Sequence, residues 1–349
     1  MRFRKFLMPT LLLGVLAGMV GAVPAAASHD VKGKVCLVTS DDFYSEFLGS
    51  SAGAKAAESK FHVATETRAG ATDAELVAHL EAFVAEGDCD LIVGDGFTVS
   101  ILMEPIMVAH PQQQFAAIDW TFGGFYDNAA EIVLLPDQSA FLAGYIAAGV
   151  TETEKVGVFG GVPVPSVTLF MDGYALGVEY YNDQHGTAVE VLGWDPGTQT
   201  GWFAFDFGDP AAGQALAGGL YDLGADIVFP VAGVTSFGAA FEATERKALG
   251  EEVAVIGVDF DWVDAFGDPD RIVLTSVVKD YGAVLFNQIE ALVNGTWTGG
   301  FVFEGLESGA VDIAPFHKLN RDVPGFLKHD LKAIRTGIID RSIDTSPIY

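Results

Sequence analysis

Residues 34–67 read KVCLVTSDDFYSEFLGSSAGAKAAESKFHVATET, and this stretch decides the fold class. Its apolar, β-branched opening predicts a strand over 34–39, and the stretch rich in alanine and serine that follows predicts a helix over 45–60. A second strand is predicted over 62–67. Strands that alternate with helices in this way build right-handed crossovers and a parallel sheet with helices on both faces. The stretch therefore predicts an α/β protein.

The same alternation continues along the chain. The next helix opens with Thr72-Asp73-Ala74-Glu75, a capping box in which the side chains of Thr72 and Glu75 satisfy each other's backbone donors. Further strands of a first series are predicted at 90–93, 115–118 and 131–135. A second series is predicted to contain strands at 155–159, 188–192, 226–231, 253–258 and 272–278, with helices at 139–150, 166–182, 211–223, 237–248 and 281–294.

The N-terminal residues predict export. A basic start at residues 2–5 precedes an apolar run over 6–23, and Ala25-Ala26-Ala27 then supplies a small-residue cleavage site. A transmembrane anchor is the alternative, but the run is short for the ~20 residues that a span needs. We expect a signal peptide over 1–27 and a periplasmic or extracellular protein. No cysteine lies near the cleavage site, so no lipobox is expected.

The remaining chain of about 320 residues predicts two lobes. Shifts in pattern near Pro136 and over 259–270 are the candidate crossings between them. A chain that leaves one lobe, builds a second and returns suggests a hinged clamp whose lobes are joined by several strands. The expected division gives the first lobe 28–136 and 262–296, and the second lobe 137–261 and 297–349.

Charge and cysteine content narrow the partners. The formal net charge is -28, because 47 Asp and Glu face 19 Lys and Arg, and such a surface repels nucleic acid and anionic lipid. An acidic surface is also typical of proteins from salty habitats. The two cysteines, Cys36 and Cys89, are too far apart in sequence to form a metal motif. Each opens an apolar run, and either a disulfide or two buried thiols fits the sequence.

Polar and aromatic residues follow the predicted strands where ligands bind in open parallel sheets. Asp119 and Asp259 each end a strongly apolar run, where a charge is costly without a function. A helix cap or turn is the alternative for any single Asp. Carboxylates accept hydrogen bonds from hydroxyls, aromatic rings stack on planar groups, and glycines allow close backbone approach. The pattern predicts a crevice for a polar, hydroxylated molecule with a planar part, bordered by Asp41, Phe43, Tyr44, Gly96, Phe97, Asp119, Trp120, Gly233 and Asp259.

Catalytic motifs do not occur in the sequence. It lacks Gly-x-Ser-x-Gly and His-Glu-x-x-His, and the glycine-rich run 157–161 lacks the Gly-Lys-Ser/Thr of a phosphate loop. No histidine falls at a strong strand end beside a candidate nucleophile. We therefore expect a binding protein without a cofactor or metal, rather than an enzyme.

Several motifs in order resemble one family, the basic membrane lipoproteins, which are the purine-nucleoside-receptor-like solute-binding proteins of ABC importers. The resemblance covers nearly all of the chain after the signal peptide. It rests on the order and spacing of the segments Phe115–Asp119, Asp137–Ala148, Lys155–Gly161, Pro165–Val178, Phe207–Pro210, Gly224–Phe229, Ala232–Gly233, Ile256–Asp259 and Leu274–Lys279.

This resemblance implies a type I periplasmic-binding fold, in which two parallel-sheet lobes joined by a multi-strand hinge close on a purine nucleoside. It also implies a monomer that serves an ABC permease in the inner membrane. Asp119 and Asp259 would hold ribose hydroxyls or base edges, and the backbone at Gly233 would approach the ligand. Two further roles come from the resemblance alone: Phe207 would stack on the base, and Lys279 would pair with the site carboxylates.

The loop after the first strand departs from the family. Members commonly carry an Asn there, whereas residues 41–47 read DDFYSEF. Asp41, Phe43 or Tyr44 would then substitute for that Asn, or the ligand would not be a standard purine nucleoside. Two other classes of function stay open: a sensory module that docks on a membrane receptor, and an enzyme that acts on nucleosides in the same crevice.

Overall fold

A computed structural model describes residues 33–40 and 47–346. The predicted signal peptide and the predicted site residues Asp41, Phe43 and Tyr44 lie outside the described residues. Within those two ranges, no helix combines the length and the apolar character that crossing a bilayer requires.

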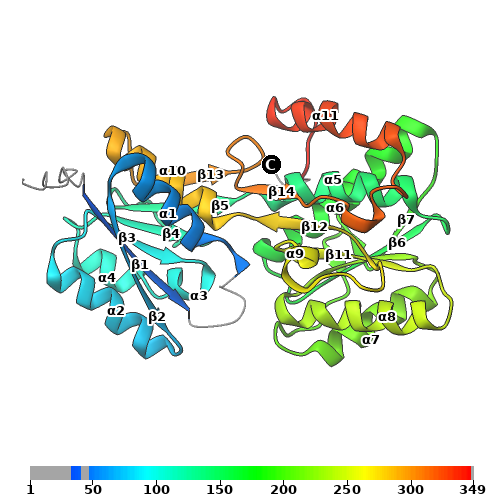
Figure 1. The fold of residues 1–349 in the computed structure, drawn as a ribbon, viewed down its shortest axis with the longest axis horizontal. Coiled ribbons are helices and arrows are strands. Elements are labelled where there is room, and N and C mark those ends of the chain that lie inside the picture. The colour runs from blue at the N-terminus through cyan, green and yellow to red at the C-terminus, as the bar shows by residue number, and fades with distance from the viewer. Residues whose placement is uncertain (1–32, 41–46, 347–349) are drawn as a thin grey trace, which may run out of the picture. The chain divides into compact units, whose positions relative to one another are not determined.

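The first of two six-stranded sheets is wholly parallel and contains the N-terminal strands (Figure 1). Its spatial order is β13 (Gly300–Glu304), β5 (Ala129–Leu134), β4 (Phe115–Ile118), β3 (Leu91–Asp95), β1 (Lys34–Ser40) and β2 (Ala64–Gly70).

Both faces of this sheet are buried, as the near-continuous apolar strands predict. Val35 and Leu37 of β1 belong to a core cluster to which two helices, α1 (Ser50–Phe61) and α10 (Tyr281–Asn294), also contribute side chains. Cys36 and Val38 face the opposite cluster, which is covered by α2 (Asp73–Glu86), α3 (Phe97–Ser100) and α4 (Glu104–Ala109). We call this sheet and its helices the first lobe.

The second sheet is parallel except for its antiparallel edge strand β14. Its spatial order is β14 (Val311–Ile313), β12 (Val273–Lys279), β11 (Ala254–Asp259), β10 (Ile227–Val231), β6 (Lys155–Gly160) and β7 (Glu190–Leu192). A separate ribbon pairs β8 (Trp194–Asp195) with β9 (Thr200–Gly201).

Helices cover both faces of the second sheet, and together they form the second lobe (Figure 1). One face carries α5 (Pro136–Val150) and α6 (Pro165–His185), and the other carries α7 (Pro210–Asp222) and α8 (Phe237–Ala248). The shorter elements are η2 (Gly233–Ser236), α9 (Trp262–Phe266) and η3 (His317–Leu319), and the last helix is α11 (Gly325–Ile339). The α/β class with two parallel sheets is therefore confirmed.

The chain crosses between the sheets three times, and two predicted assignments need correction. The expected division gave 262–296 to the first lobe, but β12 pairs with β11, so the crossing follows Lys279. It also gave 297–349 to the second lobe, but β13 pairs with β5 and returns 300–304 to the first. The elements β13, β14 and α11 were not predicted. Strand pairing is non-local, and the local apolar pattern does not say which sheet a strand joins.

The predicted capping box forms in part. The Thr72 hydroxyl accepts a hydrogen bond from the Glu75 backbone N–H at 3.3 Å, as expected for an N-cap. The Glu75 carboxylate, however, accepts from the backbone N–H of Ala71 at 2.9 Å rather than from that of Thr72. The box thus closes one residue earlier than predicted.

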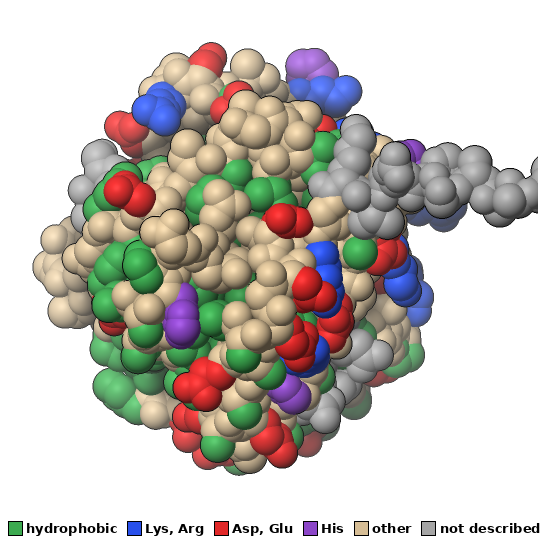
Figure 2. All heavy atoms as spheres, turned by 90° about the vertical axis from the view of Figure 1, so that its left-hand side faces the viewer, with side chains coloured by type: hydrophobic (Ala, Val, Ile, Leu, Met, Phe, Trp, Pro, Cys, Tyr) green, Lys and Arg blue, Asp and Glu red, His purple; other side chains and the backbone are tan. Residues whose placement is uncertain are grey.

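The surface is acidic, as the composition requires. Figure 2 shows acidic side chains spread over one face of the molecule, with basic side chains interspersed. Partly exposed ion pairs such as Lys34 with Glu66 and Lys60 with Glu290 join neighbouring elements. Such pairs are screened by salt and contribute little to stability.

The two cysteines form a disulfide, which answers the question that the sequence left open. The bond joins Cys36 in β1 to Cys89, just before β3, with Cα atoms 5.8 Å apart. It closes a loop whose ends are 53 residues apart in sequence.

Removing the disulfide should lower the free energy of unfolding. For a loop of this length the chain-entropy relation gives about 4 kcal/mol, mostly through the unfolded state. We expect the Cys36→Ala/Cys89→Ala variant to lose on the order of 2–4 kcal/mol in urea unfolding. A reductant should destabilise the wild-type protein but not the variant. Equal midpoints for the two proteins without reductant would contradict the expectation.

Candidate functional site

Two aspartates stand at the carboxyl ends of central strands, one from each sheet. Asp119 follows β4 of the first sheet, and Asp259 ends β11 of the second. Both have left-handed backbones, with φ of 63° and 68°. This conformation costs a non-glycine residue about 1 kcal/mol or more, and such strain gathers at functional sites. The two carboxylates are therefore candidates for ligand contacts.

One ammonium joins these two carboxylates. Lys279 is the last residue of β12, and its Nζ lies 2.7 Å from Asp119 Oδ2 and 3.8 Å from Asp259 Oδ1. The side chains of Lys279 and Asp119 are only 7% and 12% exposed. Lys279 Nζ also lies 5.1 Å from the centre of the Phe170 ring. Burial lowers the pKa of Lys279, but the charges of Asp119 and Asp259 outweigh it, so the pKa is raised and the ammonium is retained.

Tyr281, two residues after Lys279, supplies a second donor to Asp119. Its hydroxyl donates to Asp119 Oδ2 at 2.9 Å. Gly96 has φ of 86°, and a Cβ there would lie 3.0 Å from the Tyr281 ring. A side chain at Gly96 would therefore be strained and would press on this tyrosine, so the glycine allows the ring to reach its place.

Asp95, at the end of β3, is buried beside the cluster formed by Asp119, Asp259, Lys279 and Tyr281. Its carboxylate accepts a hydrogen bond from the Ser50 hydroxyl at the start of α1. Burial raises the pKa of Asp95 to about 6, although hydrogen bonds from Ser50 and Thr39 act in the opposite direction. The negative charge of Asp95 in turn helps to raise the pKa of Tyr281.

Aromatic side chains lie at the strand ends of both lobes. In the first lobe, Phe97 and Trp120 make an edge-to-face contact with ring centres 5.1 Å apart. In the second lobe, Phe207 is 43% exposed. A Cβ on Gly161 would lie 2.3 Å from the Phe207 ring, so only glycine lets the ring occupy this place. The Phe207 carbonyl accepts from the backbone N–H of Thr235 at 3.1 Å.

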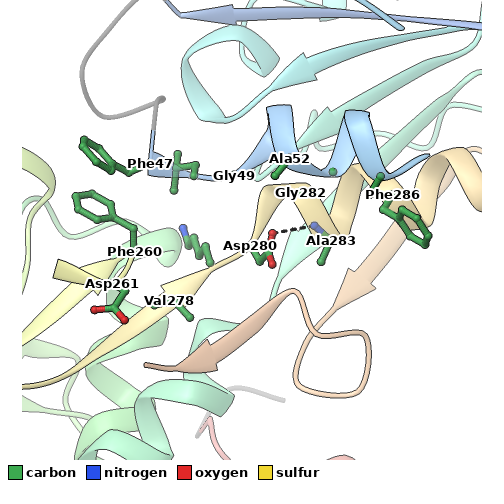
Figure 3. Close-up of a pocket in the computed structure, with 14 residues that line it drawn as sticks. Phe47, Gly49, Ala52, Phe260, Asp261, Val278, Asp280, Gly282, Ala283 and Phe286 are labelled. Carbon is green, nitrogen blue, oxygen red and sulfur yellow. Dashed lines mark hydrogen bonds between the residues drawn. The ribbon is translucent and has the colours of Figure 1, made fainter. Parts of the chain in front are cut away.

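A cavity of about 500 Å³ adjoins the carboxylate cluster but does not coincide with it (Figure 3). It runs along the seam of α1 and α10, and Asp119 and Phe207 are not among its lining residues. Phe47 and Phe260, which stack with ring centres 4.9 Å apart, close one end of it. We place the candidate site at the strand ends, because the charged and aromatic groups converge there, whereas the cavity wall is mainly apolar. Its lining residues are Phe47, Leu48, Gly49, Ala52, Gly53, Ala56, Phe260, Asp261, Val278, Lys279, Asp280, Gly282, Ala283 and Phe286.

The residues chosen from the sequence take up distinct places. Asp119, Asp259 and Lys279 come together, and Phe97 and Trp120 pair at the ends of β3 and β4. Gly233, with φ of 57°, opens η2 beside Phe207. Asp41, Phe43 and Tyr44 lie outside the described residues.

Sequence reasoning missed two members of the cluster, Tyr281 and Phe170. Tyr281 is the first residue of α10, and nothing in the local sequence pattern distinguishes it from any other residue that begins a helix. Phe170 falls inside the segment Pro165–Val178 that carried the resemblance, so its position in that segment was the available signal.

Two groups of possible metal ligands occur among the described residues, and each has another use. Cys36 and Cys89 are joined in the disulfide beside Asp88. In the second group, which also contains Asp264, Asp261 Oδ1 accepts from the start of α9 and its Oδ2 lies 2.7 Å from His317 Nε2.

Comparison with known proteins identifies the family. Residues 38–340 match the model of the ABC transporter substrate-binding proteins described as PnrA-like. The chain belongs to this family. The resemblance drawn from the motifs is thereby confirmed, and the protein is a solute-binding protein of an ABC transporter.

Its relatives are distant in sequence. It is 27% identical over 323 residues to an uncharacterized lipoprotein of Pyrococcus abyssi, which covers 87% of this chain and 74% of the relative. It is 27% identical over 263 residues to the ABC transporter nucleoside-binding protein BmpA of Lactococcus lactis, covering 72% of this chain and 70% of BmpA. The crystal structure of an ABC transporter solute-binding protein from Aeropyrum pernix K1 matches with a TM-score of 0.72 at 23% identity, over 89% of this chain and 92% of that one. The type I periplasmic-binding fold is confirmed by this match.

Lys279 should be needed for stability, because it neutralises two nearby carboxylates. We expect Lys279→Met to lower the free energy of unfolding by about 3–5 kcal/mol, the range for removing one partner of a buried ion pair. The double variant Lys279→Met/Asp119→Asn also removes the nearer of the two unbalanced charges and should recover part of the loss. Urea unfolding measures all three proteins. A Lys279→Met variant as stable as the wild type would contradict the role of the ammonium.

Asp95 should make stability depend on pH. Because burial raises its folded-state pKa to about 6, the folded state binds more protons than the unfolded state between about pH 4 and pH 6. The free energy of unfolding should therefore fall as pH rises through this window, by at most about 3 kcal/mol. Asp95→Asn removes this term, so the variant should gain stability relative to the wild type at pH 7 but not at pH 4. The same stability difference at both pH values would argue against it.

Proposed function

We propose that this solute-binding protein captures a purine nucleoside outside the cytoplasm and delivers it to the permease of an ABC importer. The observation that carries the proposal is the meeting of Asp119 and Asp259 at Lys279, with one carboxylate from each sheet. A ligand that bonds to both carboxylates would contact both lobes, and contacts of this kind favour a closed arrangement of a hinged protein.

The chemistry of the strand ends suits a nucleoside. Carboxylates accept hydrogen bonds from ribose hydroxyls or from N–H groups on a base edge. Phe207 presents a partly exposed ring. Its neighbours Gly161 and Gly233 have no side chains, so the space beside the ring is not filled by them. A planar base could stack on this ring, an interaction worth roughly 1–3 kcal/mol per base.

The relatives support the same class of ligand and the same location. BmpA of Lactococcus lactis is named a nucleoside-binding protein of an ABC transporter, and the Pyrococcus abyssi relative is named a lipoprotein. The basic and apolar pattern of residues 1–27 supports export of this chain to the periplasm or the extracellular space. A permease in the membrane would be its partner.

A thermal-shift screen tests the proposal. The panel contains purine and pyrimidine nucleosides, free bases, sugars and amino acids, with calorimetry on every hit. A ligand at a hundredfold excess over its Kd stabilises the folded state by about 2.7 kcal/mol. We expect shifts with inosine, guanosine or adenosine. A folded protein that responds to sugars or amino acids but to none of the nucleosides would overturn the nucleoside proposal.

Phe207→Ala should weaken nucleoside binding by about ten- to a hundredfold, because the base would lose its stacking partner. The control is Phe125→Ala, since Phe125 is 68% exposed and lies over Gly300 at the amino end of β13. Calorimetry with the best purine nucleoside compares both variants with the wild type. Equal affinity for Phe207→Ala and Phe125→Ala would remove the stacking role.

A further inference from the structure

We propose that Tyr281 is a specificity-determining positioning residue that, together with Lys279, occupies one oxygen of Asp119 and so leaves the other to select the ligand. The inference deepens the proposed function and rests on it for the identity of the ligand. Neither the family motifs nor the strand-end pattern pointed to Tyr281.

The two donors converge on a single oxygen. Lys279 Nζ and the Tyr281 hydroxyl both donate to Asp119 Oδ2, at 2.7 Å and 2.9 Å. No residue within 33–40 or 47–346 donates to Asp119 Oδ1. Among the described residues, Asp119 therefore uses one oxygen for these two donors and leaves the other for a ligand.

Tyr281 is held from several sides. It is 4% exposed, and its backbone N–H donates to the carbonyl of Leu48 at 3.0 Å. The preceding residue, Asp280, caps α10 through the backbone N–H of Ala283 at 2.8 Å. With Gly96 leaving just enough room for the ring, the position of the hydroxyl follows from the backbone.

The hydroxyl also keeps its proton. Burial raises the pKa of Tyr281 well above its ordinary value, and the charges of Asp119, Asp259 and Asp95 act in the same direction. Tyr281 therefore remains a neutral donor at neutral pH. Its contact with Asp119 is a hydrogen bond from a hydroxyl to a carboxylate, a class stronger than bonds between two neutral groups.

The two donors differ in the lobe to which they belong. Tyr281 begins α10 and Asp119 follows β4, so their bond lies within the first lobe. Lys279 ends β12 of the second sheet and is shared with Asp259. If the lobes move about the crossing at Asp280, the contact of Lys279 can change while Tyr281 keeps Asp119 in place. The tyrosine thus preserves the selecting oxygen in both the open and the closed arrangement.

The test compares Tyr281→Phe with a matched control, Tyr126→Phe. Tyr126 also donates to a carboxylate, that of Glu104, at 2.7 Å, but neither residue belongs to the cluster. Calorimetry gives the Kd of inosine and of its 2′-deoxy and 3′-deoxy analogues for each protein. Asp119→Asn identifies the analogue that reports on Asp119, because its discrimination against inosine collapses in that variant.

We expect Tyr281→Phe to bind inosine about tenfold more weakly and to lose most of the discrimination against the reporting analogue, by fivefold or more. Tyr126→Phe should behave as the wild type. A Tyr281→Phe variant that weakens inosine and its analogues by the same factor would show a merely structural role and overturn the inference. Unchanged discrimination of all analogues in Asp119→Asn would also overturn it.

A measurement without ligand separates this inference from the proposed function. In the wild-type protein with ζ-¹³C-tyrosine, the buried Tyr281 hydroxyl should exchange slowly enough to give separate protonated and deuterated resonances in mixed H₂O and D₂O. Asp119→Asn should shift this resonance. A single averaged resonance would refute the bond, whereas failure of inosine to bind the wild type would count against the nucleoside proposal alone.

Discussion

The structure depends on one buried ammonium placed between two carboxylates from different sheets. Without Lys279, the negative charges of Asp119 and Asp259 would face each other in a region from which most water is excluded. The backbones of both residues are also strained. Taking three charged groups out of water is expensive, and close pairing recovers that cost only when the geometry is good. Lys279, at the end of β12 where the chain leaves the second lobe, therefore links one carboxylate from each sheet.

Each lobe then contributes side chains to the candidate site. In the first lobe, Tyr281 bonds to Asp119 and Ser50 bonds to Asp95, and the Phe97 and Trp120 rings pair at the strand ends. The second lobe contributes Asp259 and Lys279 together with the Phe207 ring, which occupies the space that a Cβ on Gly161 would need. The proposed ligand has a hydroxylated part and a planar part, and both lobes offer it carboxylates and aromatic rings.

The sequence predicted the parts of the site that follow from local rules. Asp119 and Asp259 could be found because parallel strands bring their carboxyl ends to one edge, and a charge after a strongly apolar run stands out. Phe207 and Lys279 required the family motifs, since a lysine that ends a strand usually points to solvent. Tyr281 could not be found, because its contact with Asp119 requires that α10 return to the first lobe and lie beside β4. The same non-local pairing explains why β12 and the residues that form β13 were placed in the wrong lobes: a short apolar run has the same local pattern in either sheet.

Salt affects the charges on the surface and those of the candidate site differently. Pairs such as Lys60 with Glu290 are about half exposed, so high salt would weaken their attraction. The charges of Lys279 and Asp119 are largely shielded from water and ions by the lobes, so salt screens their attraction far less. A protein with this distribution can lose most of its surface electrostatics to salt and still keep the orientation of Asp119. Burial, rather than the number of charges, therefore protects the ion pairs of the candidate site from salt.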